Sequence, residues 1–191
     1  MTGRTHDLAA FTALNLFVAT QQVPSMTLAT AFVAFSANMI GGLGPDIDQT
    51  TGALWKRLRG GTILAKFISP ILGGHRHISH SILGVVLFGV VSRFFLLLIQ
   101  NVLIVDINIV WFSFMIGVLS HLFSDTFTHD GVPWLFPIPI NFGIPPVKAL
   151  RFHTGGIIEK GIVFPGLLLL NMYVFYTYHN HIIDFLRNSI R

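Results

Sequence analysis

The residues of this chain best suited to chemistry are histidines and aspartates gathered in three short islands. The first is Pro45-Asp46-Ile47-Asp48, the second covers residues 75–81, and the third covers residues 120–125. Imidazole nitrogens and carboxylate oxygens are common ligands of divalent cations such as zinc and manganese. Each island lies at the end of an apolar stretch. We therefore expect separate helices to present their polar ends to one metal site.

In the third island, His121 and Asp125 are four residues apart at the end of an apolar stretch. On a helix this spacing places two side chains on one face, where both can bind one cation. The alternative is a polar pair that only terminates the helix. An aspartate is poorly placed at the negative end of a helix dipole unless a cation neutralises it. We predict that His121 and Asp125 are metal ligands.

The first island places Asp46 and Asp48 on either side of Ile47, after a Gly-Pro turn. In an extended conformation both carboxylates project to the same side. Two neighbouring carboxylates repel each other unless a cation or a proton lies between them. The alternative is a solvated turn in which the aspartates make local hydrogen bonds. We predict that both bind metal and that Asp48 is also a candidate general base.

The second island holds three histidines within six residues, next to Arg76. We predict His80 as a metal ligand, His75 as a residue that assists catalysis, and Arg76 as the group that binds a phosphate. The alternative is a histidine-rich helix start at the membrane interface. His77 is an additional ligand candidate.

Further polar candidates are scattered near the islands. His6 opens the first apolar stretch and is counted among the ligands, while His129 and Glu159 are additional candidates. The chain has no cysteine, so any metal must be held by nitrogen and oxygen. No basic run is interleaved with aromatic residues, so a nucleic-acid partner is not expected.

The composition is that of a membrane protein. Of the 191 residues, 52% are hydrophobic and 10% are charged, and the mean hydropathy is +0.69. Ordinary soluble domains carry about a quarter charged residues. Because the first apolar stretch lacks a clear cleavage site, we interpret it as a retained helix rather than a signal peptide. We expect an all-α integral membrane protein that forms a single domain over residues 1–191. Its expected partner is the lipid bilayer.

Five stretches are predicted to cross the membrane, since about 20 apolar residues span a bilayer core of about 30 Å. They are residues 8–23, 25–43, 79–100, 102–123 and 161–178, of which the first is short and contains polar residues. The basic, amphipathic residues 54–59 predict a short interfacial helix. The stretch 130–159 is rich in Pro and Gly, and it predicts a loop or re-entrant cap near the site.

Alternating these five spans across the membrane brings all three islands to one side. Of the twelve Lys and Arg residues, nine lie on that side. The positive-inside rule therefore predicts that the site faces the cytoplasm in a multi-pass protein of the inner membrane.

Taken in order, these residues resemble the YdjM family, predicted metal-dependent hydrolases of bacterial and archaeal inner membranes. The resemblance rests on His6, on Pro45-Asp46-Ile47-Asp48, on the run from His75 through Arg76 to His80-Ser81, and on Ser120-His121 with Asp125 and the following Thr128 to Gly131. It covers roughly residues 6–140. His77 occupies a position where the family often has a small residue, so it is either an extra ligand or a substitution. The family is also thought to be remotely similar to zinc-dependent phospholipase C and P1-type nucleases.

The resemblance implies a set of site residues, namely His6, Asp46, Asp48, His75, Arg76, His80, His121 and Asp125. The leading hypothesis is a metal-dependent hydrolase, most plausibly a zinc or manganese phosphoesterase acting on a lipid or lipid-linked substrate. A non-enzymatic metal transporter or metal-stabilised scaffold is the main alternative. Acyl or glycosyl transfer without metal is a third class. The substrate, the number of ions and the oligomeric state stay open.

Overall fold

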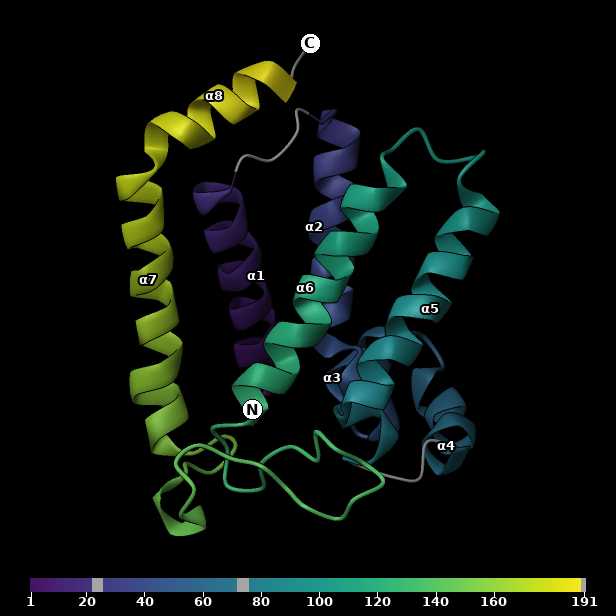
Figure 1. The fold of residues 1–191 in the computed structure, drawn as a ribbon, viewed down its shortest axis with the longest axis vertical. Coiled ribbons are helices and arrows are strands. Elements are labelled where there is room, and N and C mark those ends of the chain that lie inside the picture. Colours follow the sequence, from purple (N-terminus) through teal and green to yellow (C-terminus); the bar gives the residue numbers. More distant parts are fainter. Residues whose placement is uncertain (22–25, 72–75, 190–191) are drawn as a thin grey trace.

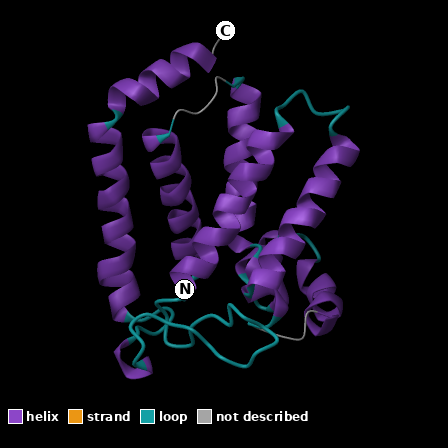
Figure 2. Ribbon diagram, viewed as in Figure 1, coloured by secondary structure: helices purple, strands orange, loops and turns teal. Residues whose placement is uncertain are grey.

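The structure is a computed structural model that describes residues 1–21, 26–71 and 76–189. These residues form helices and loops, with two isolated β-bridges and no strand among them. The long helices are α1 (Gly3–Thr20), α2 (Leu28–Leu43), α5 (Ile82–Ile99), α6 (Ile107–Asp125) and α7 (Phe164–Thr177). They run alongside one another between the two ends of the molecule (Figures 1 and 2). The prediction of an all-α fold is confirmed.

Short elements lie at both ends of this bundle (Figure 1). One end carries η1 (Pro45–Asp48), α3 (Ala53–Arg57), α4 (Gly61–Ile71) and η2 (Ile78–His80), and the other carries α8 (His179–Ser189). The predicted basic interfacial helix corresponds to α3, which is only five residues long. Helix α4 was not predicted, and it exposes Ile63, Leu64 and Phe67 while Ala65 is buried.

Three described helices are long and apolar enough to cross a membrane: Ile82–Ile99, Ile107–Asp125 and Glu159–Thr177. The last combines the π-helix η4 (Glu159–Val163) with α7. Helix α2 is apolar but shorter, so five spans remain a prediction. Helix α1 begins at Gly3 rather than at the predicted residue 8, which places His6 inside its first turns.

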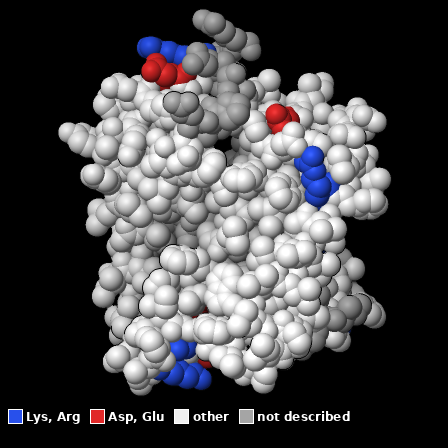
Figure 3. Space-filling view, viewed as in Figure 1, with Lys and Arg blue, Asp and Glu red and all other residues white. Residues whose placement is uncertain are grey.

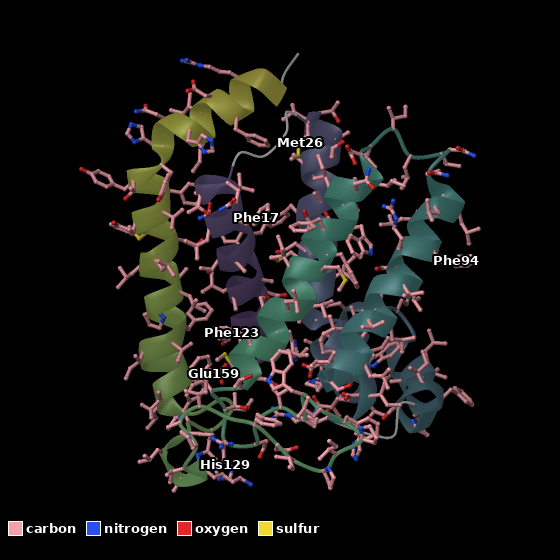
Figure 4. All side chains as sticks on the ribbon, in the orientation of Figure 1. Phe17, Met26, Phe94, Phe123, His129 and Glu159 are labelled. Atoms are coloured by element: carbon pink, nitrogen blue, oxygen red, sulfur yellow. The ribbon has the colours of Figure 1, made fainter. Side chains whose placement is uncertain are left out.

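The outer surface of the bundle suits contact with lipid. Phe94 on α5 is 63% exposed and points away from the other helices (Figure 4). On the face drawn in Figure 3, the charged side chains of the described residues lie toward the two ends, and a band of uncharged surface separates them. Because exposed apolar side chains are stable in hydrocarbon and charged ones are not, this band marks the surface that faces the membrane.

Glycines let α2 and α6 approach each other closely. A Cβ on Gly41 would collide with the carbonyl group of Phe114, and one on Gly117 would collide with that of Asn38. Small residues permit such backbone contact between helices in a membrane. The contact places the end of α2 beside the last turns of α6, which carry His121 and Asp125.

The segment between α6 and α7 lies across the end of the bundle that carries the three islands (Figure 1). It is mostly loop, with the short 3-10 helix η3 (Lys148–Leu150), as its Pro and Gly content predicted. Two isolated β-bridges, Thr128↔Phe152 and Val132↔Phe142, connect distant parts of this segment. The amide of Ile82 donates to the carbonyl of Trp134, which attaches this loop to the start of α5.

Candidate metal centre

Three histidines and two aspartates from four elements meet at this end of the bundle. His6 comes from α1, Asp46 from η1, His80 from η2, and His121 and Asp125 from α6. They form two overlapping groups in which the ligand atoms lie within 4.8 Å of one another: His6, Asp46 and His121 in one, and His80, His121 and Asp125 in the other. All three histidines are fully buried. The predicted convergence of the three islands is confirmed for these residues.

The distances between the polar atoms suit a bound cation. His121 Nε2 lies 3.7 Å from Asp46 Oδ1 and 3.9 Å from Asp125 Oδ2. His80 Nε2 lies 3.7 and 4.0 Å from the same two oxygens. Two ligands of one tetrahedral zinc ion lie about 3.4 Å apart. A contraction of a few tenths of an ångström would therefore bring these atoms to coordinating distance.

His121 is oriented by the backbone of α2. Its Nδ1 lies 2.7 Å from the carbonyl oxygen of Gly42, which can only accept a hydrogen bond, so Nδ1 carries the proton. The other nitrogen, Nε2, then presents a lone pair, and it is buried without a hydrogen-bond partner. A buried polar atom left unpaired is unfavourable. A histidine whose Nδ1–H is fixed by a carbonyl and whose Nε2 is open is arranged as a metal ligand.

His80 is oriented by Asp48. Its Nδ1 lies 3.1 Å from Asp48 Oδ2, and this carboxylate also accepts hydrogen bonds from the Arg76 amide and the Ser79 hydroxyl. Asp48 therefore lies behind His80 and is a member of neither group of potential ligands. A carboxylate in this position fixes the tautomer of a metal-binding histidine.

Residues 46–48 are not extended, because they belong to the 3-10 helix η1. In that helix Asp46 and Asp48 do not project to the same side. Asp46 approaches His80 Nε2 and His121 Nε2, while Asp48 approaches the opposite nitrogen of His80. The two carboxylates consequently occupy different positions in the site.

Arg76 contacts protein groups in the structure. Its guanidinium lies 2.9 Å from Asp125 Oδ2 and 2.8 Å from the carbonyl oxygen of Gly131, while its Nε is buried without a partner. The Met1 amino group contacts Asp125 Oδ1, and His6 Nε2 lies 3.3 Å from the same oxygen. The carboxylate of Asp125 is thus surrounded by positive and polar groups, and Arg76 joins it to the loop that follows α6.

Glu159 lies apart from the two groups, at the start of the last span beside the first turn of α1 (Figure 4). Its Oε1 accepts hydrogen bonds from the Thr2 amide and hydroxyl and from the Thr5 hydroxyl, and its Oε2 accepts one from the Gly155 amide. These contacts make Glu159 an anchor for the turn that carries His6.

The other histidine candidates lie outside the two groups. His77 is exposed, and its ring lies 5.9 Å from that of Phe136. His129 stacks on His153 at 4.4 Å, in the loop below the bundle (Figure 4). His75 lies outside the described residues. The contribution of Gly42 was missed by the sequence reasoning, although the Gly41-Gly42 pair in an apolar helix signals a close helix contact.

The His6 and His121 rings pack directly together. Their centroids are 3.6 Å apart and their planes are nearly parallel, at 7°. Both rings are buried, and both belong to the group completed by Asp46. The stacking holds the first turns of α1 against the last turns of α6, so the two rings also join these two helices at this end.

Comparison with known proteins supports an assignment to a family. The model of the YdjM inner membrane protein family matches residues 1–183. The uncharacterized protein YvsG of Bacillus subtilis is 31% identical over 182 residues, covering 92% of this chain and 95% of YvsG. Inner membrane protein YdjM of Escherichia coli is 33% identical over 111 residues, covering 53% of this chain and 47% of that protein. No solved structure matches. The chain therefore belongs to the YdjM inner membrane protein family.

Proposed function

We propose that this protein is a membrane-bound, metal-dependent hydrolase acting on a phosphoester of a lipid or lipid-linked compound. The observation that carries the proposal is the set of buried imidazoles around Asp46 and Asp125, with His121 Nε2 unpartnered and turned into the set. Such a set is stable when a cation binds it. Zinc suits the nitrogen and carboxylate donors, and manganese is the alternative.

The ligands that would hold a cation are divided between the two groups. Nδ1 of His121 is committed to the Gly42 carbonyl, so Nε2 is its one nitrogen for metal binding. A single lone pair binds a single ion, so His121 cannot serve both groups at once. His6, Asp46, His80 and Asp125 complete the coordination of the ion that His121 holds.

A divalent cation in this position supplies Lewis-acid activation of water and of a phosphoryl oxygen. Other residues of the protein orient the ligands. Asp48 fixes the tautomer of His80, and Gly42 fixes that of His121. Arg76 holds Asp125 in place, and its unpartnered Nε is a donor for an oxygen of the substrate.

The position of the centre along the helices favours a substrate at the membrane surface. His80 precedes α5 by two residues, and His121 and Asp125 lie in the last turns of α6. The phosphate groups of lipids lie at this depth, at the edge of the hydrocarbon core. Ion transporters instead place their ligands near the middle of the membrane. With five spans and the positive-inside rule, this end faces the cytoplasm.

The test is to purify the protein and measure its bound metals by mass spectrometry. Hydrolysis of phospholipids and lipid phosphates is then followed before and after chelation. We expect bound zinc or manganese and an activity that chelation abolishes and metal restores. His121→Ala should lose both metal and activity. His179→Ala, in an exposed position at the other end, is the matched control and should keep both. A protein that neither binds these metals nor hydrolyses any phosphoester would overturn the proposal.

A further inference from the structure

A cavity lies at the same end of the bundle, between the first turn of α1, helix α3 and the start of the last span. Its volume is about 620 Å³. Four basic residues line it, Arg4, Lys56, Arg57 and Lys160, together with the apolar side chains of Ala53 and Phe164. We call it the basic pocket. The combination of cations with apolar walls is typical of a site for an amphipathic anion.

The positive charge of the basic pocket is only partly neutralised. Arg57 pairs with Asp7. Within residues 1–21, 26–71 and 76–189, no carboxylate pairs with Arg4, Lys56 or Lys160. The nearby carboxylate of Glu159 is enclosed by Thr2, Thr5 and Gly155. Even with Asp7 and Glu159 counted, an excess of two positive charges remains to attract an anion.

The basic pocket is separate from the metal centre. Successive residues on a helix are rotated by about 100°, so Arg4 and His6 project about 200° apart around α1. His6 is fully buried beside His121, whereas Arg4 is exposed. An anion bound by Arg4 therefore lies on the opposite side of the first turn of α1 from the buried ligands.

The position of the pocket identifies the kind of anion. Lys160 and Phe164 lie in the first turns of the span Glu159–Thr177. Next to them, Ile157 is 90% exposed and Ile162 is 68% exposed, as expected for side chains in contact with acyl chains. The pocket thus lies at the depth of lipid headgroups, with an apolar helix surface leading from it into the membrane.

We propose that the basic pocket binds the phosphate group of an anionic phospholipid, whose acyl chains lie along the outer surface of α7. Basic pockets beside membrane-spanning helices recognise such headgroups. The lipid would join α1, α3 and α7 at the point where Glu159 anchors the turn that carries His6. This proposal does not depend on the protein being an enzyme.

The experiment measures binding of short-chain phosphatidylglycerol to the purified protein by native mass spectrometry, with phosphatidylcholine and glycerol phosphate as comparison ligands. The test variant is Lys56→Gln with Lys160→Gln. The matched control is Arg59→Gln with Lys66→Gln, which removes two exposed charges from the same end but outside the pocket. All four side chains are exposed, so both variants should fold, and thermal unfolding verifies this.

We expect the protein to prefer phosphatidylglycerol to phosphatidylcholine. The pocket variant should lose affinity for it about 25-fold, because each basic side chain near a membrane surface contributes about fivefold. The control variant should stay within about twofold of the parent protein. Equal losses in the two variants would mean a diffuse surface attraction and overturn the proposal. Binding of glycerol phosphate as tight as that of the lipid would show a site for a soluble phosphate instead, and would also overturn it.

Discussion

The carbonyl oxygen of Gly42 lies 2.7 Å from Nδ1 of His121, so the backbone of α2 determines which nitrogen of this histidine faces the candidate metal centre. The same glycine contacts α1, since a Cβ added to it would lie 2.7 Å from Cβ of Ala10 and 3.4 Å from the carbonyl oxygen of His6. One small residue therefore links the packing of three helices to the chemistry of the site.

Gly42→Ala should weaken both the fold and the metal site. The added methyl group has to push α1 away from α2, and overpacking of this kind destabilises by about 1–3 kcal/mol. Displacing the carbonyl that orients His121 should reduce zinc affinity by about 10- to 100-fold. Thermal unfolding and a zinc competition titration measure the two effects. Gly166→Ala is the control, because nothing lies within 4 Å of a Cβ there. Equal behaviour of the two variants would refute the role assigned to Gly42.

Asp48→Asn should lower zinc affinity without removing a ligand. Asparagine keeps the size of the side chain but loses the charge that holds the Nδ1 proton of His80. Loss of such a partner reduces metal affinity by about 10- to 100-fold. Asp46→Asn changes a ligand and should have a larger effect. Asp184→Asn, on exposed α8, is the control and should bind zinc normally. If Asp48→Asn binds zinc as tightly as the parent protein, Asp48 does not orient a ligand.

The spacing of residues predicted part of this site, and tertiary packing determined the rest. His121 and Asp125 could be paired from sequence because the helix itself places them on one face. Their convergence with His80 and Asp46 was predicted by alternating the five expected spans across the membrane, which brings all three islands to one side. The different positions of Asp46 and Asp48 could not be predicted, since they depend on a 3-10 turn.

Helix α4 was missed because Gly61 and Pro70 lie at its ends, where both residues usually indicate turns. The short interfacial helix was predicted to continue to Arg59, two residues beyond the end of α3. Its sequence is basic and amphipathic as far as Arg59, yet the helix ends at Arg57 and the chain turns at Gly60, which has a positive φ of 76°. Glycine adopts that conformation readily. The turn at Gly60 therefore directs the chain away from the helix direction directly after the basic, amphipathic residues 54–59.

Glu159→Gln should destabilise the protein and weaken metal binding indirectly. The carboxylate accepts hydrogen bonds from Thr2, Thr5 and Gly155, and bonds to a charged group contribute about 1.5–3 kcal/mol each. A neutral amide cannot accept at both ends, so we expect a loss of about 3 kcal/mol in stability. Glu159→Ala should be worse. If Glu159 were instead a metal ligand, zinc affinity would collapse while the unfolding temperature of the metal-free protein stayed unchanged.

Removal of metal should lower the thermal stability of the protein, since the buried imidazoles then lack their cation. A ligand that binds only the folded state at 100 times its dissociation constant stabilises it by about 2.7 kcal/mol. Adding zinc to chelated protein should therefore raise the unfolding temperature by several degrees, and His121→Ala should abolish the rise. His181→Ala, an exposed histidine on α8, should retain it. A rise that persists in His121→Ala would place the bound zinc elsewhere, because this histidine belongs to both groups of potential ligands.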